Sequence, residues 1–256
     1  MNGCVTPRRS ARRRSHTPNT DRTTRPPRCA GRSNPRPARA CSTSAPGPAR
    51  PSATLVALGA EVIAVEPDPG MPAELRRSLP DVRALPGSAE AIPLPDASVD
   101  AVLAGNSMHW FDMAVAGPEI ARVLAPNGVL AGLWNLMDDR VDWVSGLARV
   151  SGSAAVGPRD TPVAWRAETS GTHLPGTGVA ARFGSPEQAE FPHGQRRTAD
   201  SLVATIATRA GVLVMPDRER DVTLGRIRAF LASRPETARG EFTLPMLIGV
   251  LRVRRL

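Results

Sequence analysis

Short apolar runs recur along the chain from Ala53 onward, each bounded by polar or helix-breaking residues. Three of them are long and β-branched enough to be buried strands: Glu61–Val65 (EVIAV), Ser98–Ala104 (SVDAVLA) and Val129–Trp134 (VLAGLW). Val82–Leu85 is a shorter run of the same kind. Continuous apolar strands are typical of a parallel sheet that is covered on both faces.

Amphipathic segments fill the intervals between these runs. Three of them predict helices, each followed within two residues by a glycine or a proline: Ser52–Leu58, Met71–Leu79 and Pro118–Leu124. Strands that alternate with helices at this spacing indicate βαβ units, and right-handed crossovers place the helices on both faces of the sheet. The predicted fold class is therefore α/β, with a doubly wound parallel sheet.

The first fifty residues have a different composition from the rest. They hold 12 of the 33 basic residues, one acid (Asp21), all three cysteines, eight prolines and no aromatic residue. Their net charge is +11, whereas the other 206 residues carry 21 basic and 23 acidic side chains, a net charge of −2. A segment of this kind has too few apolar residues to form a core. We expect residues 1–50 to be a disordered Arg/Pro-rich tail and residues 51–256 to form the folded domain.

Several classes of protein are excluded or disfavoured by simple patterns. No apolar run reaches the length of about 18 residues that a membrane span needs. The cysteines at 4, 29 and 41 fit neither a zinc motif nor an even set of disulfides, so a reducing, cytoplasmic setting is expected. The acids Asp138, Asp139 and Asp142 do not have the spacing of a calcium loop, and no metal site is predicted.

Glu66 is the first residue that suggests chemistry. It ends the Glu61–Val65 strand, and ligands of doubly wound sheets lie beyond the carboxyl ends of the strands. An acid at this place is positioned to accept hydrogen bonds from the two hydroxyls of a ribose. The alternative is a solvated carboxylate at a strand end, and position alone does not separate the two readings.

Three separated segments, taken in order, carry a family resemblance: LVALGAEVIAVEPDPGM, GSAEAIPLPDASVDAVLAGNSMHWFD and EIARVLAPNGVLAGLWN. Together they resemble the class I S-adenosylmethionine-dependent methyltransferases, in particular the small-molecule branch called type 11. The resemblance spans Leu55–Asn135. It implies a Rossmann-like sheet in the order 3-2-1-4-5, S-adenosyl-L-methionine as cofactor and a small-molecule substrate.

The resemblance also assigns roles to individual positions. It implies that Glu66 binds the cofactor ribose, that Gly105 and Asn106 line the methionine end, and that the loop after the third strand brackets the adenine through Ser88, Ala89 and Glu90. Many members of the family have Asp where Ser88 stands. The segment that faces the substrate begins with His109, the candidate general base, and Trp110, a candidate substrate contact.

Beyond Asn135 the resemblance is weaker but continues. Gln188–Arg197 and Phe242–Val253 are expected to be two late strands that pair antiparallel at one edge, with helices at Ala199–Thr208 and Arg218–Leu231 between them. The stretch Ser151–Gly178 is rich in Gly, Ser and Thr and has weak periodicity. A mobile loop over the pocket is predicted there. The cofactor half is thus 51–135, and residues 136–256 supply the lid and the last strands.

The family's opening strand and glycine-rich loop, of the form VLDLGxGxG, do not precede Leu55. Ala40–Ala49 stand in their place and read ACSTSAPGPA. If the last base of each codon is read with the first two of the next, and the third positions are G or C, the same bases encode Val-Leu-Asp-Leu-Gly-Ala-Gly-Ala-Gly. We therefore infer a frame shift that ends near Arg50–Ala53, and expect the first strand to be missing or disrupted and cofactor binding to be impaired.

Two alternatives from other classes remain open at this point. A nicotinamide-dependent Rossmann oxidoreductase would also place Glu66 on a ribose, but the GSAEAIP loop is a methyltransferase feature. A non-enzymatic binder would use the basic tail on nucleic acid. Nucleic acid is not expected as a partner, because the tail has no aromatic side chains for base stacking and the folded remainder is slightly acidic.

Overall fold

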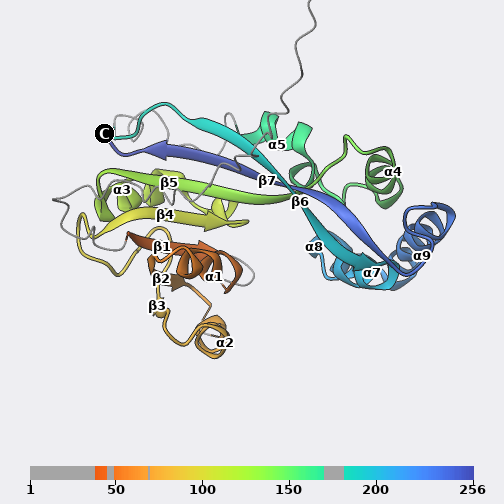
Figure 1. The fold of residues 1–256 in the computed structure, drawn as a ribbon, viewed down its shortest axis with the longest axis horizontal. Coiled ribbons are helices and arrows are strands. Elements are labelled where there is room, and N and C mark those ends of the chain that lie inside the picture. The colour runs from red at the N-terminus through yellow and green to blue at the C-terminus, as the bar shows by residue number, and fades with distance from the viewer. Residues whose placement is uncertain (1–37, 45–48, 69, 170–181) are drawn as a thin grey trace, which may run out of the picture. The chain divides into compact units, whose positions relative to one another are not determined.

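The computed structural model describes residues 38–44, 49–68, 70–169 and 182–256. Their strands form one seven-stranded sheet in the order β3-β2-β1-β4-β5-β7-β6 (Figure 1). The first five pair in parallel, and β7 runs antiparallel to both β5 and β6. The strands are β1 (Arg39–Ser44), β2 (Glu61–Glu66), β3 (Arg83–Pro86), β4 (Val99–Gly105), β5 (Leu124–Met137), β6 (Glu187–Thr198) and β7 (Glu241–Arg254). The predicted fold class and the antiparallel edge are confirmed.

The expectation of a missing first strand is corrected by β1. This strand lies inside the segment 1–50 that the sequence assigns to a disordered tail, and it pairs with β2 and β4 at the centre of the sheet. A ladder needs backbone N–H and C=O groups and room for the side chains, and no proline falls within Arg39–Ser44. Ala40, Cys41 and Ser42 are small and buried, so they fit between the neighbouring strands. Residues 1–37 and 45–48 of the predicted tail lie outside the described residues.

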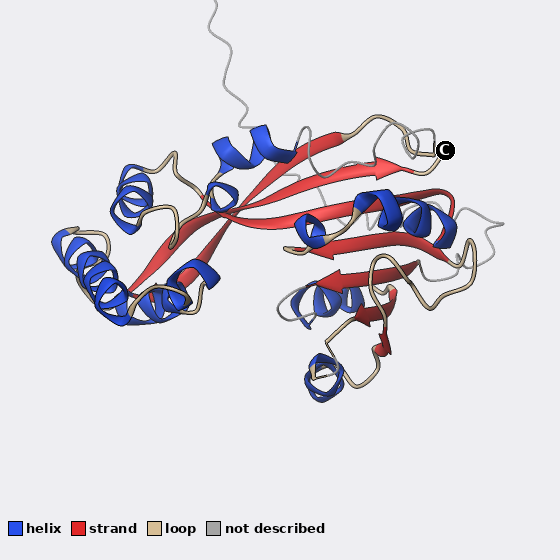
Figure 2. Ribbon diagram, turned by 180° about the vertical axis from the view of Figure 1, so that it is seen from behind, coloured by secondary structure: helices blue, strands red, loops and turns tan. Residues whose placement is uncertain are grey.

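Helices cover both faces of the sheet, as the alternation predicts. The helices α1 (Ala49–Ala57) and α2 (Met71–Ser78) lie against one face, where Val62, Ala64, Leu75 and Val82 form a small core. The helix α3 (Met113–Val123) packs on the other face and joins the largest core (Figure 2). It begins five residues before the predicted start at Pro118, because Asp112 accepts a hydrogen bond from the Ala114 N–H and caps it.

A second core lies where β5, β6 and β7 extend past the rest of the sheet. It is built on Met137, Trp143, Leu147, Ile206 and Ile227. Its helices are α4 (Asp142–Ser151), α7 (Ala199–Ala207), α8 (Ala210–Leu213) and α9 (Asp217–Ser233). The short α8 and the helix α4 were not predicted from the sequence. None of the helices within the described ranges is long and apolar enough to cross a membrane.

The stretch predicted as a mobile loop, residues 151–178, contains ordered elements in its first half. A short 3-10 helix η2 (Pro158–Asp160) and the helix α5 (Pro162–Thr169) form there. Trp165 organises α5, because its ring is buried at 1% exposure against β7 and Trp134. Residues 170–181 of the predicted loop lie outside the described part of the chain.

Gly249 on β7 packs directly against the Trp165 ring, which leaves no room for a larger side chain. A Cβ at this position would lie 2.8 Å from Cε2 of Trp165 and 2.9 Å from Cδ1 of Leu136. We expect Gly249→Ala to destabilise the protein by about 1 to 3 kcal/mol through overpacking. Gly225→Ala on α9 is the matched control, since nothing lies within 4 Å of its Cβ. It should stabilise the protein by about 0.5 to 1 kcal/mol, and urea unfolding of both variants measures the difference.

Candidate functional site

The predicted cofactor residues meet at the carboxyl edge of the parallel strands. Ser42 pairs with Ala64 of β2 and with Leu103 of β4, so Ser44, Glu66 and Gly105 stand at one level two residues later. Glu66 in turn pairs with Pro86, the last residue of β3. Four strands thus end side by side, and the chain segments that follow three of them carry the predicted positions. This is where a doubly wound sheet binds its ligands.

Glu66 is a buried carboxylate with spare acceptor capacity. Its side chain is 5% exposed, and Oε1 accepts a hydrogen bond of 3.2 Å from the Asp68 N–H. Oε2 is buried and has no hydrogen-bond partner among the described residues. Burial raises the pKa of Glu66, while the Asp68 N–H counteracts this in part. A carboxylate held in this way fits a ligand that donates two hydroxyls.

The loop after β3 is a tight turn that closes over the sheet edge. Ser88 and Ala91 exchange backbone hydrogen bonds of 3.3 and 3.2 Å, and Ala89 between them is 3% exposed. Gly87 allows this turn to lie close to β2, because a Cβ there would meet Pro93 at 2.8 Å and Val65 at 3.0 Å. The turn is therefore fixed in place before any ligand binds.

Glu90 links this turn to the next helix. Its Oε1 accepts a hydrogen bond of 3.0 Å from the N–H of Asp112, the residue whose side chain caps α3. The side chain is thus engaged with the protein itself. Glu90 thereby joins the Ser88–Glu90 turn to the segment that begins α3.

The segment after β4 turns sharply at Asn106. This residue has a φ of +51°, a conformation that asparagine tolerates better than most side chains. Its N–H donates to Leu133 O at 2.8 Å, and its Oδ1 accepts from the Asn135 N–H at 3.1 Å. Asn106 therefore ties the end of β4 to β5, next to the buried Gly105.

His109 and Trp110 follow in the 3-10 helix η1 (Met108–Trp110). Their ring centroids lie 4.9 Å apart, with the planes tilted by 42°. His109 is half-buried, whereas Trp110 is 72% exposed. A large aromatic side chain left in water at the border of a site is available to a ligand.

Arg122 on α3 is a supporting residue that the sequence reading missed. It donates to the carbonyls of Ile92 and Leu94 at 3.0 and 2.8 Å, and it binds Glu119 and Asp96 at 2.8 and 2.7 Å. Glu119 also accepts from the Ile92 N–H at 2.8 Å. The pair fastens the chain that follows the Ser88–Glu90 turn to α3. The signal in the sequence is Glu and Arg three residues apart on one helix face.

The remaining aromatic and acidic positions have structural surroundings. Trp134 and Trp143 are buried at 3% and 5% exposure, each in a core. Asp138 binds Arg140 with two side-chain contacts of 2.7 and 2.8 Å, and this lowers the pKa of Asp138. Within the described residues no group of three or more His, Cys, Asp or Glu side chains is placed to hold a metal ion.

Comparison with known proteins identifies the family. The model of the methyltransferase domain family, type 11, matches residues 43–132. An uncharacterized methyltransferase of Mycobacterium tuberculosis is 36% identical over 184 residues, which cover 72% of this chain and 70% of that protein. The chain belongs to the class I S-adenosylmethionine-dependent methyltransferases. Its methyl donor is S-adenosyl-L-methionine.

Other relatives of this methyltransferase agree in sequence and in fold. A methyltransferase-like protein of Schizosaccharomyces pombe is 37% identical over 164 residues, 63% of this chain and 60% of that protein. A solved structure described as a type II methyltransferase from Anaeromyxobacter dehalogenans superposes with a TM-score of 0.60 at 24% identity, covering 86% of this chain and 91% of that one. The latter supports the fold alone.

The Arg122 network offers a test of how the methyltransferase holds the chain that follows the Ser88–Glu90 turn. We expect Arg122→Met to destabilise the protein by about 1 to 2 kcal/mol, since the carbonyls of Ile92 and Leu94 and the carboxylate of Glu119 lose the hydrogen bonds that Arg122 donates. Arg122 lowers the pKa of Glu119, so this stabilisation is present above the ordinary glutamate pKa and is lost as the pH falls through the lowered value. Urea unfolding at pH 7.5 and at pH 3 measures it. A variant effect that is equal at both pH values would contradict the account.

Proposed function

We propose that this methyltransferase acts on a small molecule, and that the loop after β1 is altered by a frame shift that weakens cofactor binding. The observation that carries the proposal is that the carboxyl edge offers a buried carboxylate suited to a ribose, whereas the sequence after β1 is not that of a cofactor loop. Glu66 offers a buried carboxylate oxygen that lacks a donor among the described residues, as a ribose site requires. In the sequence, the residues that follow β1 do not have the family's glycine-rich pattern.

Two features of the written sequence support the alteration. Ser42 in the central strand is fully buried, and its Oγ has no hydrogen-bond partner among the described residues, which is unfavourable for a core position. The frame-shifted reading places Asp at this position, the acid that by the family resemblance meets the amino group of the cofactor. In addition, Pro46 and Pro48 have no backbone N–H to donate to a cofactor carboxylate.

The other site residues take the roles that the family resemblance assigns. Glu66 accepts hydrogen bonds from the ribose hydroxyls, and the turn Ser88–Glu90 borders the adenine. Gly105 and Asn106 line the methionine end of the cofactor. S-adenosylmethionine supplies a methyl group activated by a sulfonium, so the protein contributes mainly proximity and orientation.

His109 and Trp110 act on the methyl acceptor in this proposal. His109 accepts the proton of the attacking group when the nucleophile carries one. Trp110 provides an exposed aromatic face against which the acceptor packs. Both residues stand directly after Asn106, on the chain segment that leaves the cofactor site, which supports their assignment to the substrate side.

Two measurements test the proposal together. Resequencing of the gene across codons 15–55 is expected to find an insertion or deletion before codon 40 and its compensation near codons 50–53. Calorimetric titration of the written chain with S-adenosylmethionine is expected to give weak binding, with a Kd in the millimolar range, about −4 kcal/mol. An unbroken frame or a micromolar Kd would overturn the inferred alteration.

A further inference from the structure

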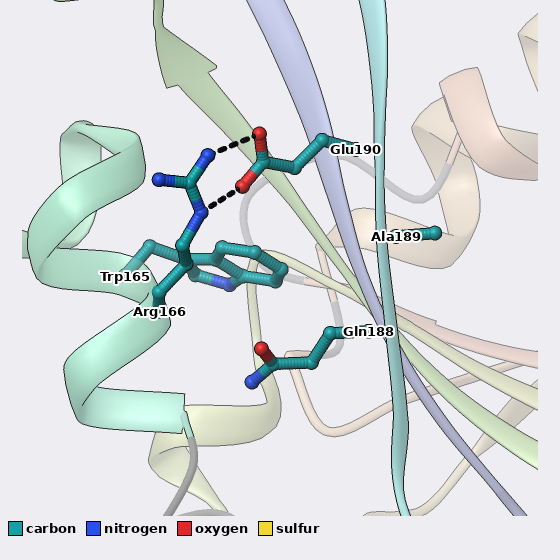
Figure 3. Close-up of a pocket in the computed structure, with 5 residues that line it drawn as sticks. All are labelled: Trp165, Arg166, Gln188, Ala189 and Glu190. Atoms are coloured by element: carbon teal, nitrogen blue, oxygen red, sulfur yellow. Dashed lines mark hydrogen bonds and ion pairs between the residues drawn. The ribbon is translucent and has the colours of Figure 1, made fainter.

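A cavity of about 340 Å³ lies between α5 and β6, away from the residues assigned to the cofactor. Figure 3 shows the side chains of α5 and β6 facing each other across it. Its lining consists of Trp165, Arg166, Gln188, Ala189 and Glu190. Neither the family resemblance nor the carboxyl-edge site uses these residues.

Trp165 gives the cavity an unsatisfied donor. Its side chain is 1% exposed and is held by the ring of Trp134, 6.0 Å away between centroids, and by Gly249. The indole Nε1 is buried and has no hydrogen-bond partner among the described residues. A buried N–H without an acceptor is unfavourable, and a ligand oxygen that accepts from it removes this penalty.

The charged groups of the cavity neutralise each other. The Arg166 Nε and Nη2 donate to the two carboxylate oxygens of Glu190 at 2.5 and 2.7 Å (Figure 3). A paired guanidinium has little attraction left for a second anion. The cavity therefore favours an uncharged ligand.

Access to the indole requires a lining side chain to move. Gln188 and Arg166 are both exposed, and the Gln188 Nε2 donates to Thr169 Oγ1 at 3.1 Å. Figure 3 shows the indole lying between these two side chains. A rotation of the exposed Gln188 opens the indole edge without disturbing the core around Trp134.

We propose that this cavity binds an uncharged aromatic molecule that carries a carbonyl or ether oxygen. The oxygen accepts a hydrogen bond from the Trp165 indole N–H, and the ring packs on the indole and on the stem of Arg166. The Arg166–Glu190 pair excludes the corresponding carboxylate. The pair thereby acts as a specificity device of the cavity.

The position of the cavity relates it to methyl transfer. Glu190 is opposite Gly249, and Gly249 is opposite Trp134, which lies one residue beyond the carbonyl that Asn106 binds. The cavity therefore stands level with the end of β4, three strand spacings or about 14 Å away. We assign it to the part of the methyl acceptor that is remote from the reacting atom, a step that rests on the proposed function.

The test uses nitrogen-15 spectra of the full chain, in which the four tryptophans give four indole signals. Trp165→Phe identifies the signal of Trp165. Acetophenone, benzoate and ethylbenzene serve as probes of similar size, respectively with a neutral oxygen, with a charge and with neither. Acetophenone should bind with a Kd of about 1 mM, as its nine heavy atoms allow, and should move the Trp165 signal downfield.

Two variants decide the chemistry. Trp165→Phe should weaken acetophenone binding roughly fivefold, since one hydrogen bond is lost. Glu190→Gln removes the carboxylate that binds Arg166 Nε and Nη2, and benzoate should then bind about tenfold more tightly than to the parent chain. Glu187→Gln, whose carboxylate pairs with Arg252, is the control on the same strand and should change neither affinity.

The outcomes separate this proposal from the proposed function. An unmoved Trp165 signal overturns the cavity proposal even if the protein binds S-adenosylmethionine. So does ethylbenzene if its affinity equals that of acetophenone. A shifted Trp165 signal in a chain that binds S-adenosylmethionine weakly agrees with both proposals. A shifted signal in a chain with a micromolar Kd for the cofactor supports the cavity and overturns the inferred alteration alone.

Discussion

Replacing residues 40–48 by Val-Leu-Asp-Leu-Gly-Ala-Gly-Ala-Gly is expected to strengthen the binding of S-adenosylmethionine about 100-fold, or 2.7 kcal/mol. The replacement supplies backbone N–H groups where Pro46 and Pro48 have none, and it places an acid at position 42. Ser42 stands two residues before the level of Glu66 and Gly105, so its replacement falls next to the carboxyl edge. Calorimetry of the written and the restored chain gives the ratio of their dissociation constants.

A third chain with Asn in place of the new Asp separates the two contributions. If the acid meets the cofactor's amino group, the chain with Asn should bind S-adenosylmethionine about tenfold more weakly than the restored chain with Asp, as expected for the loss of a hydrogen bond to a charged group. The glycine-rich loop alone should retain the remainder. Equal affinity of the written and the restored chain would show that the loop is not the defect.

Glu66→Gln is expected to move binding and stability in opposite directions. In the restored chain it should weaken S-adenosylmethionine about 30-fold, because a neutral amide accepts from the ribose hydroxyls less strongly than a carboxylate. In the absence of cofactor it should stabilise the chain at pH 7.5 by about 1 kcal/mol, since a buried charge is removed. Calorimetry and urea unfolding measure the two effects.

The stability effect has a definite pH dependence. Burial raises the pKa of Glu66 above its ordinary value, so the folded state binds the proton more tightly than the unfolded chain. The favourable contribution is fully present below the ordinary pKa and is lost as the pH rises through the raised value. The advantage of Glu66→Gln should therefore be large at pH 7.5 and small at pH 3.5. Glu61→Gln, at the exposed start of the same strand, should leave the cofactor affinity unchanged and should not stabilise the chain, since it only loses an exposed ion pair with Arg39.

The parallel part of the sheet was predictable because its strands are continuous apolar runs. β2, β4 and β5 are largely apolar and lie inside the sheet, and the family resemblance implied their order in it. β1 was missed because Arg39–Ser44 has no apolar pattern. It forms through the backbone ladders that β2 and β4 offer on either side, and small side chains are sufficient there.

The helices α4 and α5 were missed for a different reason. The sequence of α4 is amphipathic but contains Gly and Ser, and its pattern was overlooked. The helix α5 begins with Pro162, has weak periodicity and is held by long-range contacts such as that of Trp165 with β7. The Arg122 network joins residues 26 to 30 positions apart through the Asp96 carboxylate and the backbone carbonyls of Ile92 and Leu94. Such contacts depend on the folded loop and leave no periodic signal in the chain.

The candidate site was likewise predictable where it depends on topology and not where it depends on side-chain contacts. Glu66, Ser88, Gly105 and Asn106 lie together because each ends or follows a strand of one parallel sheet. The engagement of Glu90 with the Asp112 N–H is a side-chain contact that topology does not determine. The cavity beside Trp165 lay in a segment for which the sequence predicted only a loop.

Cys41 allows local opening of the sheet around the central strand to be measured by alkylation. Its thiol is fully buried in β1, and burial raises its pKa to about 12. A protonated, enclosed sulfur does not react with alkylating reagents, because the thiolate is the nucleophile. In a chain whose other two cysteines are replaced by serine, only Cys41 can be alkylated. The observed rate is then the fraction of molecules in which β1 has separated from β2 or β4, multiplied by the alkylation rate of an exposed thiol.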